Sequence, residues 1–228
     1  MIGSHDSYTF HKATKGIYNK SLIRRTWKAQ NMNIAEQYEH GVRMFDVRVC
    51  RDGNKWRVCH GAAEFDETFA SIQCICDFFD RLYPDAIYRI WLEKGSKAVE
   101  KRFIAESVND YCHCSLCDFY PNLWRVGIKS YKEWTKGICN NNNSLYNRGY
   151  LFAKDAPWSG NCHELHGTMS FKNYFKGSLE SQAKKYNRKI MSTVPKDQIY
   201  GKEHLYLIDF VDQMLPLEIT KSPMKMRT

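Results

Sequence analysis

The chain has 228 residues, of which 43% are hydrophobic and 14% aromatic, and this is enough apolar material for one well-packed core. No stretch reaches the roughly 18 consecutive apolar residues of a membrane-spanning helix, which argues against an integral membrane protein. The formal net charge of +9 favours an anionic partner, either a phospholipid surface or a nucleic acid, without choosing between them.

The amino terminus and the cysteines indicate a compartment. The chain starts Met-Ile-Gly-Ser-His and lacks the basic start and apolar run of a secretory signal, which predicts a cytoplasmic protein if this is the full product. Nine cysteines, an odd number, fit reduced thiols. The Cys-x-Cys-x-x-Cys cluster at 112–117 lacks the spacing of paired zinc knuckles, so we expect small thiols there. Zinc stays an alternative if the fold brings Cys139, Cys162 or His163 close.

The first predicted elements are a short strand, a basic segment and a helix. Residues 1–7 are expected to form a strand that ends in an exposed turn at His5. Residues 8–33 are polar and basic and predict a loop and a short helix, which form either a solvated face or a rim that faces phosphate or membrane. Residues 34–40 are expected to be helical, and Gly41 ends this helix.

A buried strand that carries two charges follows. Residues 42–50 are rich in apolar and β-prone side chains, and Asp46 and Arg48 share one face because side chains alternate along a strand. Two charges on a core strand cost free energy unless they pair or bind something. A structural ion pair is one explanation, and the mouth of an active site is the better one. After a hairpin turn, the returning strand over residues 56–60 ends at His60.

The rest of the chain alternates between helices and strands. We expect helices at 68–83, 97–111 and 179–191, a helix end within 131–139, and strands at 86–92, 150–153, 169–174 and 204–211. A loop at 158–168 is expected to expose His163 and His166. The alternation predicts an α/β fold over 1–228: a single-domain β/α barrel, either regular or distorted and incomplete, with a flexible basic tail at 221–228.

Several polar residues fall at the expected carboxyl ends of strands, where such barrels carry their catalytic groups. These residues are His5, Asp46, Arg48, His60, Lys94, Lys154 and Asp209. Two histidines and an arginine suit the cleavage of a phosphodiester. One histidine can take a proton from the attacking hydroxyl, the other can give one to the leaving oxygen, and the arginine can hold the phosphate.

Three motifs occur together in the first part of the chain. They are Gly-Ser-His-Asp-Ser at 3–7, Gln…Ile-Ala-Glu-Gln…Gly-Val-Arg…Asp-Val-Arg within 30–48, and Cys-His-Gly at 59–61. In this order and spacing they resemble the catalytic X domain of phosphatidylinositol-specific phospholipase C. The resemblance implies a barrel enzyme that acts on phosphatidylinositol or a related lipid. Attack by a neighbouring hydroxyl would release diacylglycerol and a cyclic inositol phosphate.

The same resemblance implies the roles of the acid and the base. His5 matches the general base that deprotonates the inositol 2-hydroxyl, and Asp209 matches the carboxylate that orients this base. His60 matches the general acid for the diacylglycerol oxygen, and Asp6 assists it. Adjacent carboxylates favour the imidazolium form, which suits a proton donor.

The resemblance also implies how phosphate is bound without metal. Arg48 matches the arginine that binds the phosphate, and Asp46 matches a supporting carboxylate. The bacterial-type members of the family have an arginine at this place, whereas the calcium-dependent members have metal and acidic ligands. Asp6 stands where the calcium type would have an asparagine. We therefore expect a metal-independent enzyme without a cofactor.

The substrate contacts depart from the bacterial-type pattern. Later strands of those members supply an arginine and an Asp-x-Tyr that hold the inositol ring, and the counterparts here are Lys154 and the segment from Lys172 to Tyr174. The tyrosine is retained, but Lys172 replaces the carboxylate. A lysine cannot accept hydrogen bonds from sugar hydroxyls and would favour an extra phosphate or another anion. Lys94 is a further expected sugar or phosphate contact.

Two alternatives remain open beside the lipase hypothesis. The same two-histidine chemistry would suit RNA or another soluble phosphodiester, and an inactive module could use the basic surface to bind membranes. We favour an anionic phospholipid, a phosphoinositide at a membrane surface, as the partner over nucleic acid. We also expect a monomer that associates peripherally with the membrane.

Overall fold

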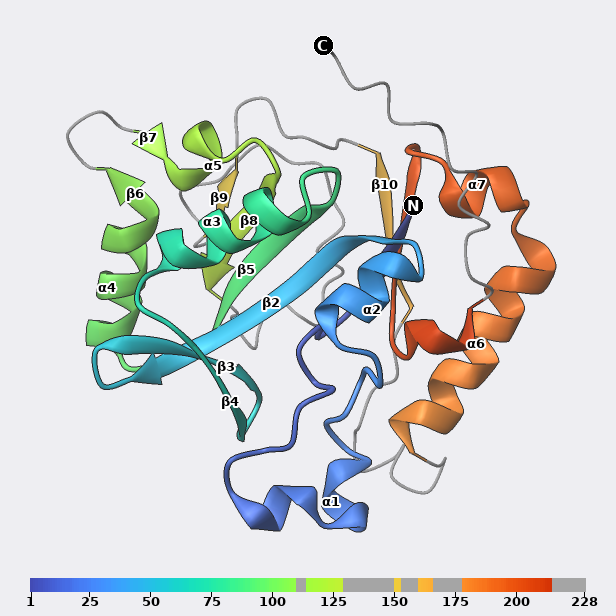
Figure 1. The fold of residues 1–228 in the computed structure, drawn as a ribbon, viewed down its shortest axis with the longest axis horizontal. Helices are drawn as coiled ribbons and strands as arrows, with labels where there is room; N and C mark the ends of the chain where they lie inside the picture. The colour runs from blue at the N-terminus through green and yellow to red at the C-terminus, as the bar shows by residue number, and fades with distance from the viewer. Residues whose placement is uncertain (110–113, 129–149, 153–159, 166–177, 215–228) are drawn as a thin grey trace.

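The computed structural model describes residues 1–109, 114–128, 150–152, 160–165 and 178–214 (Figure 1). One sheet contains the strands β1 (Ile2–Ser4), β2 (Val42–Asp52), β3 (Lys55–His60), β4 (Ala63–Phe69), β5 (Ile87–Lys94), β8 (Leu123–Ile128), β9 (Tyr150–Phe152), β10 (Asn161–Leu165) and β11 (His204–Ile208). A separate small pair is formed by β6 (Val108–Asn109) and β7 (Cys114–Ser115).

The helices of the described residues lie on both flanks of this sheet. They are α1 (Ser21–Arg24), α2 (Ile34–Glu39), α3 (Ile72–Leu82), α4 (Lys97–Ser107), α5 (Leu116–Phe119), α6 (Leu179–Thr193) and α7 (Lys196–Tyr200), with the 3-10 turns η1 (Gly16–Asn19) and η5 (Val211–Gln213). Figure 1 shows α6 and α7 on the side of β10, and α3 and α4 on the side of β5 and β8. No helix in the described part of the chain has the length and apolar character needed to cross a membrane.

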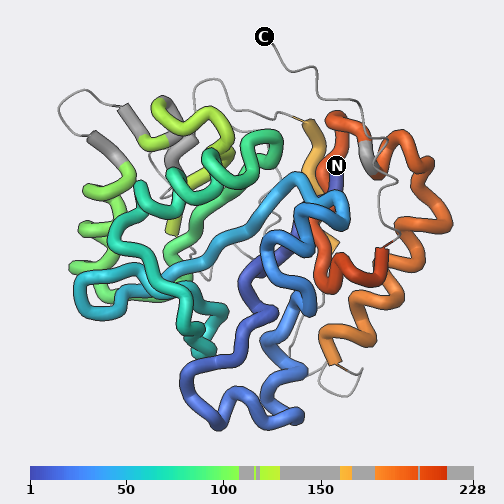
Figure 2. Tube along the Cα trace, viewed as in Figure 1, coloured from blue at the N-terminus to red at the C-terminus, as the bar shows by residue number. Residues whose placement is uncertain are grey.

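The sheet has the strand order β10-β11-β1-β2-β5-β8-β9, and the β3–β4 hairpin extends from β2. The six strands from β10 to β8 in this order are parallel, whereas β9 pairs antiparallel with β8. The first strand, β1, lies between β2 and the last strand, β11, so the two ends of the described chain meet in the sheet (Figure 2). The expected α/β fold is confirmed as a distorted or incomplete β/α barrel.

Two apolar layers show which face of the strands points inward. The larger cluster contains Phe45, Val47 and Val49 of β2, which pack toward α3 and its neighbours. The smaller cluster contains five residues from four strands or their ends: Met44, Ile87, Trp124, Leu205 and Leu207. Because side chains alternate along β2, Asp46 and Arg48 lie on the same inner face as Met44.

Gly3 is required by the close packing of this inner layer. A Cβ atom on Gly3 would lie 2.9 Å from Leu205 Cδ1 and 3.1 Å from both Leu207 Cδ1 and Met44 Cβ. The missing side chain lets β1 approach its neighbours, which fixes the strand that carries His5.

The helix predicted at 68–83 begins later than expected. It starts at Ile72 after the N-cap Ser71, whose side chain accepts a hydrogen bond from Cys74 N at 3.1 Å. The preceding residues form β4 instead, with Phe65 and Phe69 buried in the core. The spacing of Phe65, Phe69 and Ile72 also fits one helix face, so periodicity alone could not separate the strand from the helix.

Two strands of the main sheet were missed in the later part of the chain, in addition to the short pair β6 and β7. Strand β8 contains Arg125 and Gly127, which interrupt its apolar run. Strand β10 occupies much of the loop predicted at 158–168 and is mostly polar. His163 is therefore a strand residue: its ring stacks on Tyr206 with centroids 5.0 Å apart, and its Nε2 lies 3.0 Å from His204 Nδ1.

Several predictions lie outside the described residues. They concern His166, the helix end within 131–139, the strand at 169–174, the tail at 221–228, and Cys112, His113 and Cys139 of the alternative zinc cluster. The helix predicted at 97–111 ends at Ser107. The remaining predicted strands and helices among the described residues start or end within a few residues of the expected positions, whereas α5 and α7 were not predicted.

Candidate active site

The turn after β1 is locked to the middle of β2. Asp46 N donates to Ser7 Oγ at 2.7 Å, and Ser7 Oγ donates to Ser4 O at 2.9 Å. Asp6 N donates to Asp46 Oδ2 at 3.0 Å, and Asp6 adopts a left-handed conformation with φ of 48°. An aspartate tolerates this conformation better than most residues, so the turn can direct His5 and Asp6 toward the same space.

His5 has a defined hydrogen-bonding state in this structure. Its ring is buried, and Arg48 Nη2 lies 2.7 Å from Nε2 while Asp209 Oδ1 lies 2.7 Å from Nδ1. A guanidinium only donates, so Nε2 is the acceptor and Nδ1 carries the proton that is donated to Asp209. These contacts select the neutral imidazole, whose lone pair at Nε2 accepts from Arg48.

Asp209 reaches His5 because β11 is the parallel neighbour of β1. It follows Ile208 directly, and the next residue, Phe210, is left-handed with φ of 50°. A bulky residue rarely adopts this conformation, and surrounding contacts must maintain it. Phe210 N donates to Ala29 O at 2.6 Å, which supplies one such contact.

Arg48 is surrounded by carboxylates. Its Nε lies 2.5 Å from Asp6 Oδ1, its Nη2 lies 2.9 Å from Asp46 Oδ2, and its Nη1 lies 3.6 Å from Glu93 Oε2. The Arg48 side chain is only 2% exposed. A buried guanidinium needs such partners, because an uncompensated charge in the core would be strongly unfavourable.

The pKa values of this ion-pair network follow from the balance between burial and charge. Burial alone would raise the pKa of Asp46, but the charges of Arg48 and Arg89 outweigh it and hold that pKa below its usual range. Burial alone would lower the pKa of Arg48, but Asp46, Asp6 and Glu93 raise it above its usual range. The pair is therefore ionised throughout the working pH range.

His60 has the opposite bonding state to His5. It ends β3 with a side chain that is 18% exposed, and its Nδ1 lies 2.7 Å from the carbonyl oxygen of Trp27. Its Nε2 lies 3.2 Å from Asp6 Oδ2. Both ring nitrogens thus face acceptors, and only the imidazolium can donate to both. The surroundings of His60 favour a proton donor.

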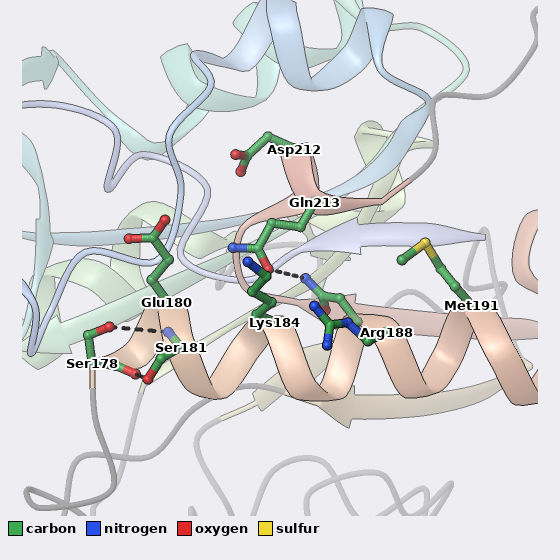
Figure 3. A pocket seen from close by; sticks show the side chains of 9 residues that line it. Ser178, Glu180, Ser181, Lys184, Arg188, Met191, Asp212 and Gln213 are labelled. Atoms are coloured by element: carbon green, nitrogen blue, oxygen red, sulfur yellow. Dashed lines mark hydrogen bonds between the residues drawn. The ribbon is translucent and has the colours of Figure 1, made fainter.

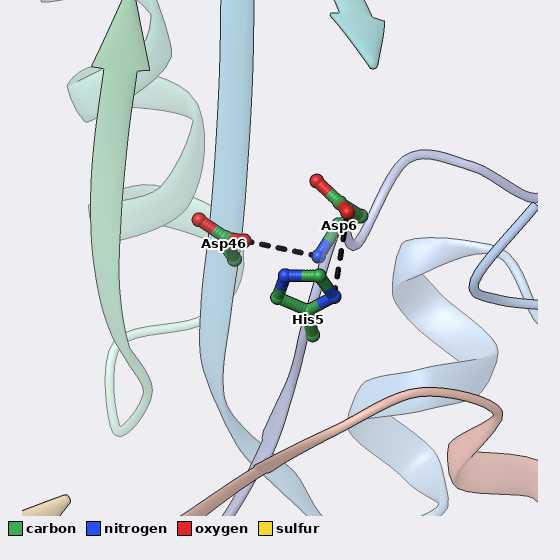
Figure 4. Close-up of side chains that lie close together, drawn as sticks. All are labelled: His5, Asp6 and Asp46. Atoms are coloured by element: carbon green, nitrogen blue, oxygen red, sulfur yellow. Dashed lines mark hydrogen bonds and ion pairs between the residues drawn. The ribbon is translucent and has the colours of Figure 1, made fainter. Parts of the chain in front are cut away.

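Six of the residues singled out by the sequence come together in this way. They are His5, Asp6, Asp46, Arg48, His60 and Asp209. Figure 4 shows His5 and Asp6, from the turn after β1, beside Asp46 on β2. Asp6 Oδ2 joins the two rings, at 3.3 Å from His5 Nδ1 and 3.2 Å from His60 Nε2.

Sequence reasoning missed two charged residues on β5. Arg89 Nε donates to Asp46 Oδ1 at 2.7 Å, and Arg89 Nη1 donates to Glu164 Oε1 at 2.7 Å. Glu93 lies further along β5 on the same face as Arg89, and it accepts a hydrogen bond from Gly61 N at 2.9 Å. The alternation of charged residues along the predicted strand was the available signal, because odd positions from 89 to 93 share the inner face.

Two glutamines support the catalytic turns. Gln30 Nε2 donates to the carbonyl oxygens of His5 and Ile208 at 2.9 and 3.0 Å. Gln37 Nε2 donates to Ser7 O at 2.8 Å. Both residues belong to the recognised motif, where no role was assigned to them. Here they donate to backbone carbonyl oxygens at the turns that carry His5 and Asp209.

The predicted substrate-binding lysine on β5 lies apart from the network around Arg48. Lys94 Nζ lies 2.7 Å from Glu64 Oε1 on the β3–β4 hairpin, and its side chain is 41% exposed. Its neighbour Glu93 is the residue that faces Arg48. The other predicted substrate contacts, Lys154, Lys172 and Tyr174, lie outside the described residues.

The guanidinium of Arg48 supplies the positive charge beside the acidic groups of the site. Ligand atoms of His5, Asp6 and Asp46 lie within 4.8 Å of one another, which is close enough to hold a metal ion. The guanidinium of Arg48 contacts both carboxylates of this group. A metal ion would have to compete with Arg48 for the same oxygens, so these residues fit a guanidinium better than a metal.

Two cavities in the described residues lie beside the site rather than in it. The larger, about 620 Å³, is lined by α6 and η5, and Figure 3 shows Lys184 and Arg188 of α6 below Asp212 and Gln213. The smaller, about 240 Å³, includes Arg24, Arg25 and Lys28 among its lining residues. Neither of these two cavities is lined by a histidine.

No protein-family model matches the sequence, and no curated protein is significantly similar to it. Solved structures are similar in fold. The phosphatidylinositol-specific phospholipase C of Staphylococcus aureus is 15% identical with a TM-score of 0.57, and the match covers 92% of this chain and 85% of that one. The Listeria monocytogenes enzyme is 15% identical with a TM-score of 0.53, covering 94% and 89%. The chain thus has the fold of the bacterial phosphatidylinositol-specific phospholipases C.

Proposed function

We propose that the protein is a metal-independent enzyme of the phospholipase C type that cleaves phosphatidylinositol or a related lipid. The fold similarity to the bacterial enzymes supports this proposal, as do the motifs in the first part of the chain. The main observation behind this proposal is that the two histidines differ in their hydrogen bonds, one accepting at Nε2 and the other facing acceptors only. His5 presents a lone pair at Nε2, and His60 faces acceptors with both nitrogens.

These states support a base and an acid in one reaction. His5 Nε2 takes the proton of a hydroxyl next to the phosphate in the headgroup, and the hydroxyl oxygen forms a new bond to phosphorus. The bond between phosphorus and the diacylglycerol oxygen breaks, and His60 Nε2 gives a proton to that oxygen. The products are diacylglycerol and a cyclic inositol phosphate. An attacking group within the substrate removes most of the entropic cost of a bimolecular step.

In this reaction Arg48 binds the phosphate. Asp46 positions Arg48, and Asp209 positions His5. In the resting site, Arg48 Nη2 occupies His5 Nε2, so phosphate binding would draw the guanidinium away and free the base. Asp46 Oδ2 accepts from both Nε and Nη2 of the guanidinium. Asp209 fixes the tautomer of His5 through Nδ1.

A lipid substrate requires contact with a membrane, and we assign this contact to the segment from η1 to α1. Ile17 and Leu22 are 55% and 61% exposed there, and Lys15, Lys20 and Arg24 flank them in sequence. Apolar side chains among basic ones suit the interface of an anionic bilayer. The same segment continues to Trp27, whose carbonyl oxygen contacts His60.

The test uses vesicles that contain labelled phosphatidylinositol, with a chelator present, and thin-layer separation of the products. We expect cyclic inositol phosphate and diacylglycerol from the wild type, and neither from the His5→Ala and His60→Ala variants. If no inositol lipid yields a cyclic phosphate, the proposal is wrong. Vesicle binding without turnover would instead indicate an inactive membrane-binding module.

One observation favours a second candidate, the cleavage of RNA or another soluble phosphodiester. The chain has a net charge of +9, and three cationic residues line the smaller cavity. A ribose 2-hydroxyl could be the internal nucleophile in the same two-histidine reaction. Cleavage of an oligoribonucleotide by the wild type but not by His5→Ala would establish this activity, and intact RNA would exclude it.

A further inference from the structure

The buried side of helix α6 contains one polar residue among apolar ones. Its four buried positions are Leu179, Ala183, Asn187 and Ile190, which lie about one turn apart. Asn187 is only 1% exposed. Asparagine is a poor helix former, and a buried amide costs free energy unless it is hydrogen-bonded. An apolar residue would suit this position better, so a specific contact must offset these costs.

Asn187 contacts the turn that follows β11. Its Nδ2 donates to Asp209 O at 2.9 Å and to Phe210 O at 3.2 Å. Its Oδ1 has no hydrogen-bond partner in the part of the chain that the structure describes. The donor end of the amide is therefore the end that the fold uses. Phe210 also clusters with Leu179 and Ala183, so α6 is fixed against this turn by polar and apolar contacts.

The turn needs such partners because its backbone conformation is uncommon. Phe210 has a φ of 50°, which a residue with a bulky side chain rarely adopts. The next residue, Val211, donates its N–H to Gln30 Oε1 at 3.1 Å. Asn187 supplies donors to the carbonyl oxygens of the two preceding residues, so two separate segments of the chain hold the turn.

The same turn carries the carboxylate that meets the proposed base. Asp209 Oδ1 lies 2.7 Å from His5 Nδ1. The carbonyl group and the side chain of Asp209 share one Cα atom, so a rotation of the backbone at this position also moves the carboxylate. A hydrogen bond weakens when its atoms move apart or out of line, so a shift of the turn would loosen the contact with His5.

We propose that Asn187 is a positioning residue of the reaction: by donating to Asp209 O and Phe210 O, it keeps the Asp209 carboxylate on His5 Nδ1. The inference deepens the proposed function, on which it rests for the reaction, and adds a residue outside the three sequence motifs. Asn187 acts through the backbone of Asp209 and takes no part in proton transfer itself.

The first test separates positioning from stability. Asn187→Leu keeps the size of the side chain, removes the donor, and matches the apolar residues around it on α6. We expect this variant to fold, because leucine favours a helix, while kcat on phosphatidylinositol vesicles falls about tenfold and KM stays unchanged. A folded variant with the kcat of the wild type would overturn the inference.

Gln213→Ala is the matched control for this loss. It removes another amide from the wall of the same cavity, and its Oε1 approaches Asn187 Nδ2 only at 3.5 Å. The donors to Asp209 O and Phe210 O remain in this variant, so its kcat should equal that of the wild type. An equal loss of kcat in Gln213→Ala and Asn187→Leu would also overturn the inference, because it would show a general effect of the cavity wall.

A chemical rescue provides a second variant. Asn187 lines the cavity of about 620 Å³, so a small molecule can reach the space that Asn187→Ala leaves. Acetamide carries N–H donors, whereas acetone has the same shape without them. We expect acetamide to restore part of the kcat of this variant and acetone to restore none. Equal effects of the two molecules, or no rescue by acetamide, would count against the role of the donor.

A spectrum of His5 separates this inference from the proposed function. In the wild type the Nδ1 proton of His5 should resonate far downfield, because a carboxylate accepts it at short distance. We expect the signal to move upfield in Asn187→Leu and to stay in place in Gln213→Ala. An unmoved signal in Asn187→Leu would contradict the inference alone. Absence of lipid cleavage by the wild type would contradict the proposed function, and the spectrum would still decide the inference.

Discussion

At the scale of single residues, Asp6 is the group that both histidines share. Its Oδ2 lies close to a nitrogen of each ring, and its Oδ1 lies 2.5 Å from Arg48 Nε. One carboxylate therefore contacts the proposed base, the proposed acid and the arginine proposed to bind the phosphate. Its left-handed φ shows that the backbone is held in an uncommon conformation to bring this about.

Replacing Asp6 by Asn should mainly affect the proposed acid. The amide keeps the shape but removes the charge that favours the His60 imidazolium, so we expect kcat on phosphatidylinositol vesicles to fall at least about 100-fold. Asp66→Asn is the matched control, since that side chain is 90% exposed, and it should behave as the wild type. A variant at position 6 with full activity would contradict the shared role.

Asp46 allows a stability prediction at the same scale. Replacing it by Asn leaves Arg48 and Arg89 buried without their common counter-charge, and we expect a loss of about 3 kcal/mol in the free energy of unfolding. The exposed pair of Arg57 and Asp52 provides the control, because Asp52→Asn should cost less than about 1 kcal/mol. Urea unfolding at neutral pH measures both.

The lowered pKa of Asp46 also predicts a pH dependence. A carboxyl whose pKa is lower in the folded than in the unfolded state stabilises the fold above the unfolded value and loses this contribution as the pH falls. For an aspartate the loss begins below about pH 4. Urea titrations should show a steeper fall in stability below that pH for the wild type than for Asp46→Asn. Equal slopes would show that Asp46 does not titrate in this way.

At the scale of elements, the proposed membrane contact includes the short helix α1. Helix α1 spans Ser21–Arg24, follows the 3-10 turn η1, and exposes Leu22 to 61%. A helix this short has no stability of its own. Trp27, which is buried and donates its ring N–H to Tyr18 O at 2.9 Å, holds the segment together.

Replacing Leu22 by Ser should therefore weaken vesicle binding without disturbing the site. Loss of one inserted side chain is worth roughly 1.5–3 kcal/mol, so we expect binding to phosphatidylinositol vesicles to fall about tenfold or more. Leu82→Ser at the end of α3 is matched in residue type, being 47% exposed, and should bind as the wild type. Sedimentation with vesicles measures both, and equal losses would show that α1 is not the contact.

The sequence predicted strands and helices well where the spacing of apolar residues fitted only one of the two. Strands β2 and β5 have long buried runs, and the hairpin to β3 has a clear turn, so the positions of Arg48 and His60 could be predicted. Strand β4 was hidden because Phe65 and Phe69 also fit a helix. Glu93 and Arg89 were missed for a different reason: their role depends on which strand pairs with β2, and pairing is a tertiary property.

At the scale of the whole molecule, charge should govern the approach to a lipid surface. A net charge of +9 attracts an anionic bilayer over a distance set by the ionic strength. We expect binding to vesicles of anionic phospholipid to weaken when salt is raised from about 50 to 500 mM, while weaker binding to zwitterionic vesicles changes little. Binding to anionic vesicles that is independent of salt would show that apolar insertion alone supports the contact.

The pairing of β1 with β11 has a consequence for how the protein is made. His5 and Asp209 are 204 positions apart, yet Nδ1 of the first lies 2.7 Å from Oδ1 of the second. During translation the histidine leaves the ribosome 204 residues ahead of its carboxylate partner. A polypeptide that stops before residue 209 thus lacks the carboxylate that holds His5 Nδ1, and we expect it to be inactive.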